Sequence, residues 1–254
     1  MDGPTAVAGN LNGPQVRLVD VSNSANLVLK GITSVQISSC GAVAIHGNQV
    51  AVGELLQPHI MLLDISDLNN PRTIGMLFAA TIASGFSSLA FLDRNIVVGA
   101  GPNDSQIQKV DFSNPASLQG KKQPTGLPGV LTLDADSTSH LIVVGSPNGR
   151  QVKLFDQNLI EIGSADSMLP GIASVSLSGR VALVASQFNT QFALIDFGVN
   201  PPRVTTSTAF NNLVGVATVA FDGQFGAFGS QSGTPSLSLF DLSGALHGAQ
   251  PNHL

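Results

Sequence analysis

The sequence predicts an all-β protein, a six-bladed β-propeller of four-stranded antiparallel blades whose first blade is either incomplete or completed by a strand from elsewhere. Three observations carry this prediction. A short apolar run closed by an aspartate returns six times, its period lies near 45 residues, and two further apolar runs precede each later aspartate. A period of about 40–50 residues with several strands per unit is typical of propeller blades. The aspartates are Asp20, Asp64, Asp111, Asp156, Asp196 and Asp241, spaced 44, 47, 45, 40 and 45 residues apart.

Each unit is predicted to contain four strands in hairpin order. Pairs such as "AVAIHG" with "QVAVG" and "SVSLSG" with "VALVAS" are separated by tight polar or glycine turns, the signal of a β-hairpin. The aspartate closes the third strand, and a weaker run such as "RTIGML" follows as the fourth. We expect one domain, 1–254, with blades near 1–31, 32–78, 79–122, 123–165, 166–209 and 210–254.

The first strand of each unit alternates large and small side chains. Val43 and Ile45 are separated by alanine, and Val175 and Leu177 by serine. Side chains alternate between the two faces of a strand, so one face of each blade is bulky and the other thin. Stacking bulky faces on thin faces buries both, and a closed ring protects the sheet edges.

The repeated aspartates are predicted to be structural. Each one stands just before a turn such as "DVSN" or "DFSNP", where a carboxylate can accept backbone N–H groups of the turn. Six equivalent positions argue against a catalytic role for any of them.

The first and last units depart from the pattern. Six third strands are evident but only five first strands, because few residues precede "TAVAG". Either the chain begins inside its first blade, or closure of the ring borrows a strand from elsewhere. The tail "ALHGAQPNHL" is predicted to supply at best a poor outer strand for the last unit.

The segments "VRLVDVSNSANLVLKG", "IMLLDISDLNNPRTIG" and "IQKVDFSNPASLQG" resemble LVIVD repeats, the propeller-forming repeats of bacterial and archaeal surface or exported proteins. The resemblance is good for the first three units and weaker for the last three, which contain "FDQN", "DFGVNPP" and "DLSG". It implies a propeller that is secreted, periplasmic or on the cell surface. It brings no shared catalytic residues. Because "MDGPTAVAGN" has neither a basic flank nor an apolar signal core, we expect the signal of an exported protein to be absent from this chain.

Composition excludes several classes of protein. The chain is 43% apolar and 11% charged, which is too apolar for a disordered chain. A net charge of −5 without a basic run argues against nucleic-acid binding. No apolar segment reaches the 18 residues of a membrane span. The single cysteine, Cys40, excludes an intrachain disulfide and a zinc site built of several cysteines.

A ring of amides is predicted on the face where second and third strands are joined. Five residues before each aspartate stands a glutamine or another polar residue, and asparagines come three residues earlier in some units. Amides donate and accept, so they suit a polar, uncharged ligand; alternatively, they satisfy loop backbone groups. The candidate ligand-binding residues are Gln15, His59, Asn103, Gln106, Asn148, Gln151 and Gln191.

Apolar loops join successive blades, and each has a glycine near the next first strand, at Gly85, Gly129, Gly171 and Gly215. Their large side chains are predicted either to ring the mouth of the channel, as a pocket or a patch for a partner, or to fill the top of the core. The candidates are Phe86, Leu127, Leu169, Phe210 and Leu213.

Four polar residues occur in single units: Glu54, His59, Asp104 and Arg150. They are the candidates for catalysis if the protein is an enzyme. No nucleophile elbow, nucleotide loop or H-E-x-x-H motif occurs. The "DADSTS" segment begins like a calcium loop but lacks its glycine and its distal glutamate, so neither a metal nor a cofactor is predicted.

These observations favour a noncatalytic binding propeller that recognises a small molecule or a protein on its loop face. A lyase, isomerase or hydrolase at the mouth of the central channel is the alternative. A purely structural interaction module is a third reading. The absence of Trp and Tyr weakens a lectin role, because sugar rings commonly stack on aromatic side chains.

Overall fold

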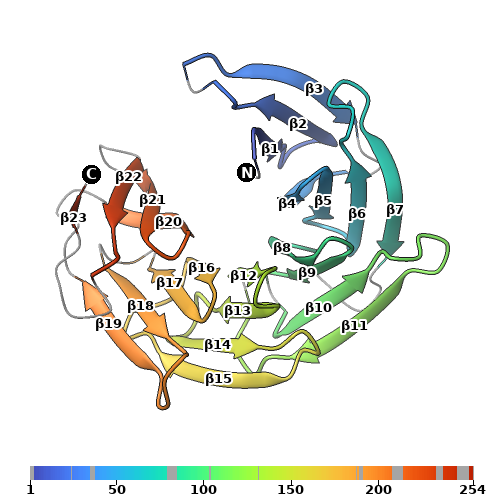
Figure 1. The fold of residues 1–254 in the computed structure, drawn as a ribbon. Helices are drawn as coiled ribbons and strands as arrows, with labels where there is room; N and C mark the ends of the chain where they lie inside the picture. Colours follow the sequence, from blue (N-terminus) through green and yellow to red (C-terminus); the bar gives the residue numbers. More distant parts are fainter. Residues whose placement is uncertain are drawn as a thin grey trace. The chain divides into compact units, whose positions relative to one another are not determined.

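The computed structural model describes residues 3–23, 25–34, 38–78, 85–102, 104–130, 132–186, 188, 191–207, 214–232, 237–244 and 252–253. All regular structure in these residues is β-strand, arranged in six antiparallel sheets (Figure 1). The chain divides into two compact units, Met1–Pro124 and Thr125–Leu254, each with three sheets. No described segment forms a helix that could cross a membrane.

The first unit contains one three-stranded sheet and two four-stranded sheets. Neighbours along the chain pair in each sheet, as a propeller blade requires. The first sheet is β1 (Thr5–Gly9), β2 (Gln15–Asp20) and β3 (Val28–Ser34); the second is β4 (Cys40–His46), β5 (Gln49–Glu54), β6 (His59–Asp64) and β7 (Arg72–Phe78); the third is β8 (Ser88–Asp93), β9 (Ile96–Ala100), β10 (Gln106–Asp111) and β11 (Gln119–Pro124).

The second unit contains three four-stranded sheets built in the same order. They are β12 (Thr132–Asp136), β13 (Leu141–Gly145), β14 (Gln151–Phe155) and β15 (Glu161–Asp166); then β16 (Ser174–Ser178), β17 (Val181–Ala185), β18 (Phe192–Asp196) and β19 (Arg203–Ser207); then β20 (Val214–Phe221), β21 (Phe225–Ser232), β22 (Leu237–Asp241) and β23 (Asn252–His253). The two residues of β23 come from the tail, so the predicted poor outer strand is present.

Six blades of three or four antiparallel strands confirm the predicted fold class. The short first blade is confirmed as well. Strand β1 pairs with the aspartate-closed strand β2 through Thr5 and Asp20, as β5 pairs with β6 through Gln49 and Asp64. It therefore holds the place of a second strand, and no first strand accompanies it among the described residues.

Apolar faces of successive sheets pack together inside each unit. Val16 and Leu18 of the first sheet share a core with Val50 and Met61 of the second. Phe86, which precedes β8, lies fully buried between the second and third sheets with Ile60 and Leu62. In the second unit, Val175 and Leu177 of β16 pack against the sheet of β12–β15. The predicted contact between bulky strand faces and neighbouring blades is thus the source of the cores.

The six repeated aspartates form the turns that the sequence predicts. In every case Oδ1 accepts the backbone N–H of the residue two positions later, the geometry of an Asx turn. The six bonds run to Asp20 from Ser22 (2.9 Å), to Asp64 from Ser66 (2.9 Å), to Asp111 from Ser113 (2.8 Å), to Asp156 from Asn158 (2.8 Å), to Asp196 from Gly198 (2.7 Å) and to Asp241 from Ser243 (2.9 Å).

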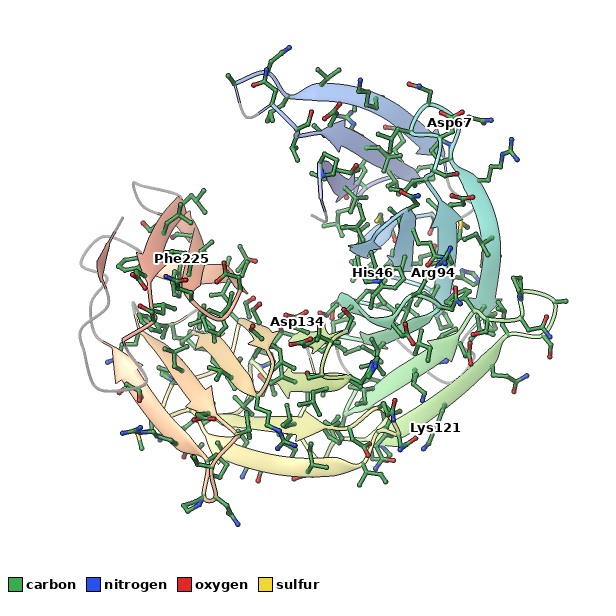
Figure 2. The ribbon with its side chains drawn as sticks, in the orientation of Figure 1. His46, Asp67, Arg94, Lys121, Asp134 and Phe225 are labelled. Atoms are coloured by element: carbon green, nitrogen blue, oxygen red, sulfur yellow. The ribbon has the colours of Figure 1, made fainter. Side chains whose placement is uncertain are left out.

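Polar side chains link the first strands of successive blades in the second unit. Oγ1 of Thr132 accepts the Val175 N–H at 3.2 Å, and Oγ of Ser174 accepts the Val219 N–H at 3.1 Å. Oδ2 of Asp134, which is labelled in Figure 2, accepts the Leu177 N–H at 2.9 Å. Burial raises the pKa of Asp134, although the hydrogen bonds from Leu177, Ala135 and Ser176 oppose this effect. Small polar residues on a first strand therefore satisfy backbone groups of the next first strand.

Candidate functional site

A pocket of about 330 Å³ lies at the loop end of the first sheet, lined by Ala8, Gly9, Asn10, Gln15 and Arg17. Ala8 and Arg17 are opposite each other in the β1–β2 ladder, and Gln15 lies two residues from Arg17. Side chains two apart share a face of a strand, so Ala8, Gln15 and Arg17 belong to one face of the sheet. The opposite face holds Val16 and Leu18 and is packed on the second sheet.

Asn10 builds the loop at this pocket. Its side-chain oxygen accepts the Asn12 N–H at 3.0 Å, and its backbone N–H donates to the Gln15 carbonyl at 3.0 Å. Its carbonyl oxygen accepts N–H groups from Gly13 (3.2 Å) and Cys40 (3.1 Å). The loop is consequently fixed from both sides, and Gln15 begins β2 at the edge of the pocket.

Arg17 supplies the charge of the pocket. Its side chain is exposed, and no carboxylate in the described part of the chain lies within ion-pair distance of it. Lys153 occupies the corresponding third-strand position of the fourth sheet, but it pairs with Glu161 at 2.9 Å. A guanidinium stays charged and can bind a carboxylate through two parallel hydrogen bonds. The pocket therefore offers one cation and two amides.

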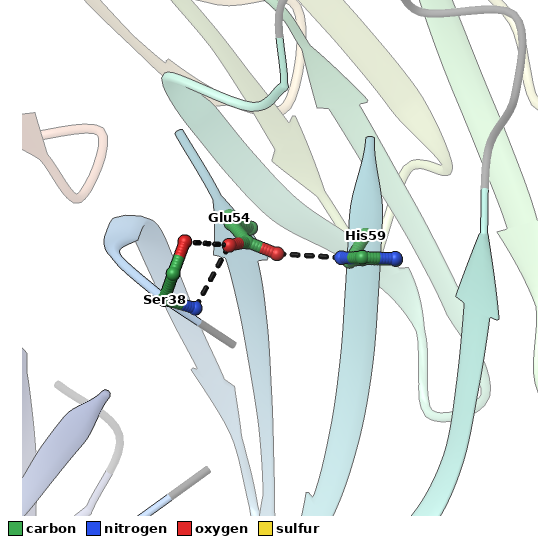
Figure 3. A network of polar contacts seen from close by, with 3 residues as sticks. All are labelled: Ser38, Glu54 and His59. Carbon is green, nitrogen blue, oxygen red and sulfur yellow. Dashed lines mark hydrogen bonds and ion pairs between the residues drawn. The ribbon is translucent and has the colours of Figure 1, made fainter. Parts of the chain in front are cut away.

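A second polar cluster lies at the same end of the neighbouring sheet, where Glu54 stands between Ser38 and His59 (Figure 3). Oε1 of Glu54 accepts the Ser38 N–H at 2.8 Å and also the Ser38 hydroxyl. Oε2 lies 2.5 Å from Nδ1 of His59. Glu54 is 2% exposed, whereas the His59 side chain is 25% exposed and its ring centroid lies 5.0 Å from that of Phe78.

The charge of Glu54 is maintained by these contacts. Burial raises its pKa, but hydrogen bonds from Ser38 and His59 outweigh burial and hold the pKa below its ordinary value. A carboxylate at neutral pH can only accept hydrogen bonds, so Nδ1 of His59 carries the hydrogen of this contact. Nε2 is the ring nitrogen that remains for another partner. The Ser38 hydroxyl bonds to the acid and not to the imidazole. The cluster is therefore not a serine–histidine–acid triad, in which histidine stands in the middle.

The position of Glu54 has a structural counterpart in other blades. Ser146 and Ser186 also follow a second strand, and their hydroxyls donate to the carbonyls of Pro128 (2.5 Å) and Pro170 (2.6 Å), each in the loop that enters the same blade. Glu54 makes the same connection through Ser38. What distinguishes the second blade is the charge of Glu54 and its contact with His59.

The remaining amide candidates occupy equivalent places in their own blades. Gln106 and Gln151 begin β10 and β14, and Gln191 directly precedes β18. The backbone N–H of Asn148 donates to Oγ of Ser146 at 3.1 Å. Asn103 lies outside the described residues.

Of the four singular residues, the structure brings together Glu54 and His59. Arg150 instead forms an exposed ion pair with Asp166, Nε to Oδ1, at 3.1 Å. The backbone N–H of Asp104 donates to the Gly101 carbonyl at 3.3 Å in the loop before β10.

The apolar candidates that can be placed are interior residues. Phe86 and Leu169 are 0% exposed and Leu127 is 2% exposed. Phe86 and Leu169 belong to the cores between sheets, so they offer no surface to a ligand. Phe210 and Leu213 lie outside the described residues.

The "DADSTS" carboxylates are used within the protein. Asp134 accepts from Ser176 and Leu177, and Asp136 accepts the backbone N–H groups of Thr138 and Gly179. No group of three metal-ligating side chains occurs among the residues that the structure describes.

Arg17, Asn10 and Ser38 are the site residues that sequence analysis missed. The sequence did contain a signal for Arg17, namely its charge. The equivalent third-strand position holds the uncharged residues Met61, Ala193 and Ser238 in other units. Ser38 carries no comparable signal, because only the fold brings it to Glu54.

Comparisons with known proteins address the fold. No family model matches the chain, and no curated protein matches it. Among solved structures, a chain in the "Crystal Structure of Mitotic Checkpoint Complex" superposes with a TM-score of 0.72 over 90% of this chain and 68% of that chain. The fold is a β-propeller. At 15% sequence identity the likeness concerns the fold alone, and function must be argued from the site.

Proposed function

We propose that this protein is a noncatalytic binding propeller whose loop-face pocket on the first sheet takes a small polar molecule bearing a carboxylate. The observation that carries the proposal is Arg17, a cation without an ion-pair partner among the described residues, at the edge of a pocket of about 330 Å³ that also contains Gln15 and Asn10.

The chemistry of the pocket fits such a ligand. Small-molecule sites commonly measure about 300–1,000 Å³ and orient their ligands with few polar groups. The guanidinium would take the carboxylate, and the Gln15 amide would donate to or accept from a neighbouring hydroxyl or amine. Ala8 places only a methyl group on this face of β1, so a ligand can approach the β1 backbone closely.

Thermal shift at low ionic strength tests the proposal with a panel of small hydroxy- and amino-carboxylic acids. A ligand present at about 100 times its Kd stabilises a protein by about 2.7 kcal/mol. We expect at least one acid to raise the Tm, Arg17→Gln to abolish this rise, and Arg180→Gln, a change of another exposed arginine, to retain it. No response from the panel, or an equal response in Arg17→Gln, would remove the support for this site.

The contact between Glu54 and His59 favours one alternative, an enzyme of the lyase, isomerase or hydrolase type. A buried carboxylate that fixes Nδ1 leaves Nε2 of His59 as a general base. In that case His59→Ala should lower turnover of a substrate by about 10²–10⁴-fold, while Ser38→Ala retains most of it. Unchanged turnover in His59→Ala would exclude this role.

We further propose that the chain is an LVIVD-repeat protein that acts outside the cytoplasm. The supporting observation is the repeated apolar third strand closed by an aspartate turn. Fractionation of the native cells is the test, and recovery of the protein from the cytoplasm alone would contradict export.

A further inference from the structure

We propose that the Asn148–Gly149 peptide is a modification site, at which the neutral side chain of Asn148 deamidates to a carboxylate in the folded protein. Water is the co-reactant. This inference goes beyond the ligand pocket of the first sheet, because it concerns the loop that joins β13 to β14 and needs no contribution from Arg17.

The reaction joins the backbone nitrogen of Gly149 to Cγ of Asn148. The nitrogen gives its proton to solvent and attacks Cγ, and the side-chain amide takes up a proton and leaves as ammonia. The product is a five-membered succinimide ring. Water then opens one of the two ring C–N bonds. Cleavage at Cγ gives aspartate, and cleavage at the former main-chain carbonyl gives isoaspartate, so one water is consumed for each ammonia released.

The chain contains two Asn–Gly pairs in equivalent loops, Asn148–Gly149 between β13 and β14 and Asn12–Gly13 between β1 and β2. In each loop the asparagine N–H donates to a side-chain oxygen two residues earlier, Oγ of Ser146 at 3.1 Å or Oδ1 of Asn10 at 3.0 Å. The glycine N–H donates to the carbonyl of the same residue, at 3.3 Å or 3.2 Å. The second pair is therefore an internal control with the same local hydrogen bonds.

Space and exposure distinguish the two pairs. Both asparagines are exposed, but Gly149 is half-buried, whereas Gly13 is buried. A Cβ built on Gly149 would have Cγ of Pro128 as its nearest neighbour, at 3.8 Å, whereas a Cβ on Gly13 would lie 3.1 Å from Nδ2 of Asn10. Ring closure needs room around the glycine and access of solvent to its nitrogen. The structure therefore favours reaction at Asn148 over reaction at Asn12.

The hydrogen bond of the Gly149 N–H does little to oppose the reaction. The Ser146 carbonyl accepts two N–H groups, that of Ile172 at 2.9 Å and that of Gly149 at 3.3 Å. Loss of the longer bond leaves this carbonyl with a partner, so the cost of a fully unsatisfied buried group does not arise. The side-chain amide of Asn148 makes no hydrogen bond to another described residue, so its rotation toward the Gly149 nitrogen breaks no such bond.

The product changes the charge of the loop and leaves its anchor intact. The new carboxylate stands two residues before Arg150, whose Nε pairs with Oδ1 of Asp166 at 3.1 Å. This ion pair is exposed, so its disturbance has a small effect on stability. Oγ of Ser146 ties the loop to the Pro128 carbonyl at 2.5 Å, ahead of the modified peptide. We therefore expect one added negative charge on a blade that stays folded.

Ageing of the full chain at mildly alkaline pH tests the inference. Peptide mass analysis measures the conversion of each asparagine to an acid, and isoaspartate methyltransferase labels the rearranged product. We expect Asn148 to react about tenfold or more faster than Asn12, since the buried glycine must first be exposed at a cost of about one hydrogen bond. In urea this difference should disappear. Gly149→Ala should remove the excess of reaction at Asn148 and leave Asn12 unchanged.

Three results would overturn the inference. They are equal rates at the two asparagines in the native chain, an excess at Asn148 that persists in urea, and no reaction at Asn148 during a period in which the urea-unfolded chain reacts there. Arg17→Gln should be modified at Asn148 at the native rate, so failure of the ligand pocket and failure of this site remain distinguishable.

Discussion

Ser176 donates its hydroxyl to Oδ2 of Asp134 across two blades at 3.0 Å, and the same Oγ accepts the Phe221 N–H of a third blade at 3.1 Å. One serine thus joins β12, β16 and β20, the first strands of three successive sheets. Each of these sheets contributes one side chain or one backbone group, so the connection depends on the stacking of the blades and not on local sequence.

Ser176→Ala should destabilise the second unit. The change leaves the Phe221 N–H without its acceptor and removes one donor from the buried Asp134 carboxylate, which together cost about 1–3 kcal/mol. Urea denaturation of the full chain measures the loss. Ser178, two residues further along the same strand, makes no comparable bond to another described residue, so Ser178→Ala should cost less than about 0.5 kcal/mol. Equal losses in the two variants would show that the connection contributes nothing.

The turn aspartates should make stability depend on pH. Hydrogen bonds from the Ser113 hydroxyl and backbone N–H lower the pKa of Asp111 below its ordinary value. Its carboxylate therefore stabilises the fold above an unfolded pKa of about 3.9, and this contribution is lost as the pH falls through the folded pKa. Asp111→Ala should be less stable than the native chain by about 1 kcal/mol at pH 7. The difference should shrink as the pH falls below the unfolded pKa of about 3.9. A difference that stays constant with pH would contradict a role for the charge.

Gly85 should tolerate no side chain. Its φ is +73°, and an added Cβ would lie 2.2 Å from the Leu55 carbonyl oxygen and 2.4 Å from that of Glu54. Gly47 has a φ of +54° but open space around it. Gly47→Ala should cost about 1 kcal/mol through backbone conformation alone, and Gly85→Ala should cost at least about twice as much. Thermal unfolding of both variants is the measurement, and an equal Tm would show that the close approach has no energetic effect.

Cys40 should be inert in the folded protein. Its side chain is 4% exposed, and burial raises the pKa of the thiol to about 11. Thiolate is the reactive form, so a disulfide reagent at pH 8 should modify the native chain far more slowly than the urea-unfolded chain. Rapid modification of the native protein would mean that the core around β4 opens readily.

Much of the fold could be predicted because the same pattern of strands and turns recurs along the chain. The alternation around Val175 and Leu177 and the turn after each aspartate are local patterns, and local patterns can be read from the sequence. The links between blades could not be predicted, since Thr132 and Val175 are 43 residues apart and meet only after the sheets have stacked.

The candidate site could be predicted only in part for the same reason. Gln15, Glu54 and His59 occupy recurring positions, so their placement at the loop end followed from the repeat. The contact of Ser38 with Glu54, the absence of an ion-pair partner for Arg17 among the described residues, and the burial of Phe86 depend on which faces pack, and one sequence does not specify this. Leu169, for which the sequence left open the channel mouth and the interior, belongs to the core.

The most direct test of the account compares Asp111→Ala with Arg17→Gln in thermal unfolding, each with and without a carboxylate that stabilises the native chain. The account holds that repeated residues maintain the fold and that the departure at Arg17 binds the ligand. It predicts that Asp111→Ala has a lower Tm and a full response to the ligand, whereas Arg17→Gln keeps the native Tm and has no response. A native Tm with no ligand response in Asp111→Ala, or a full response in Arg17→Gln, would contradict it.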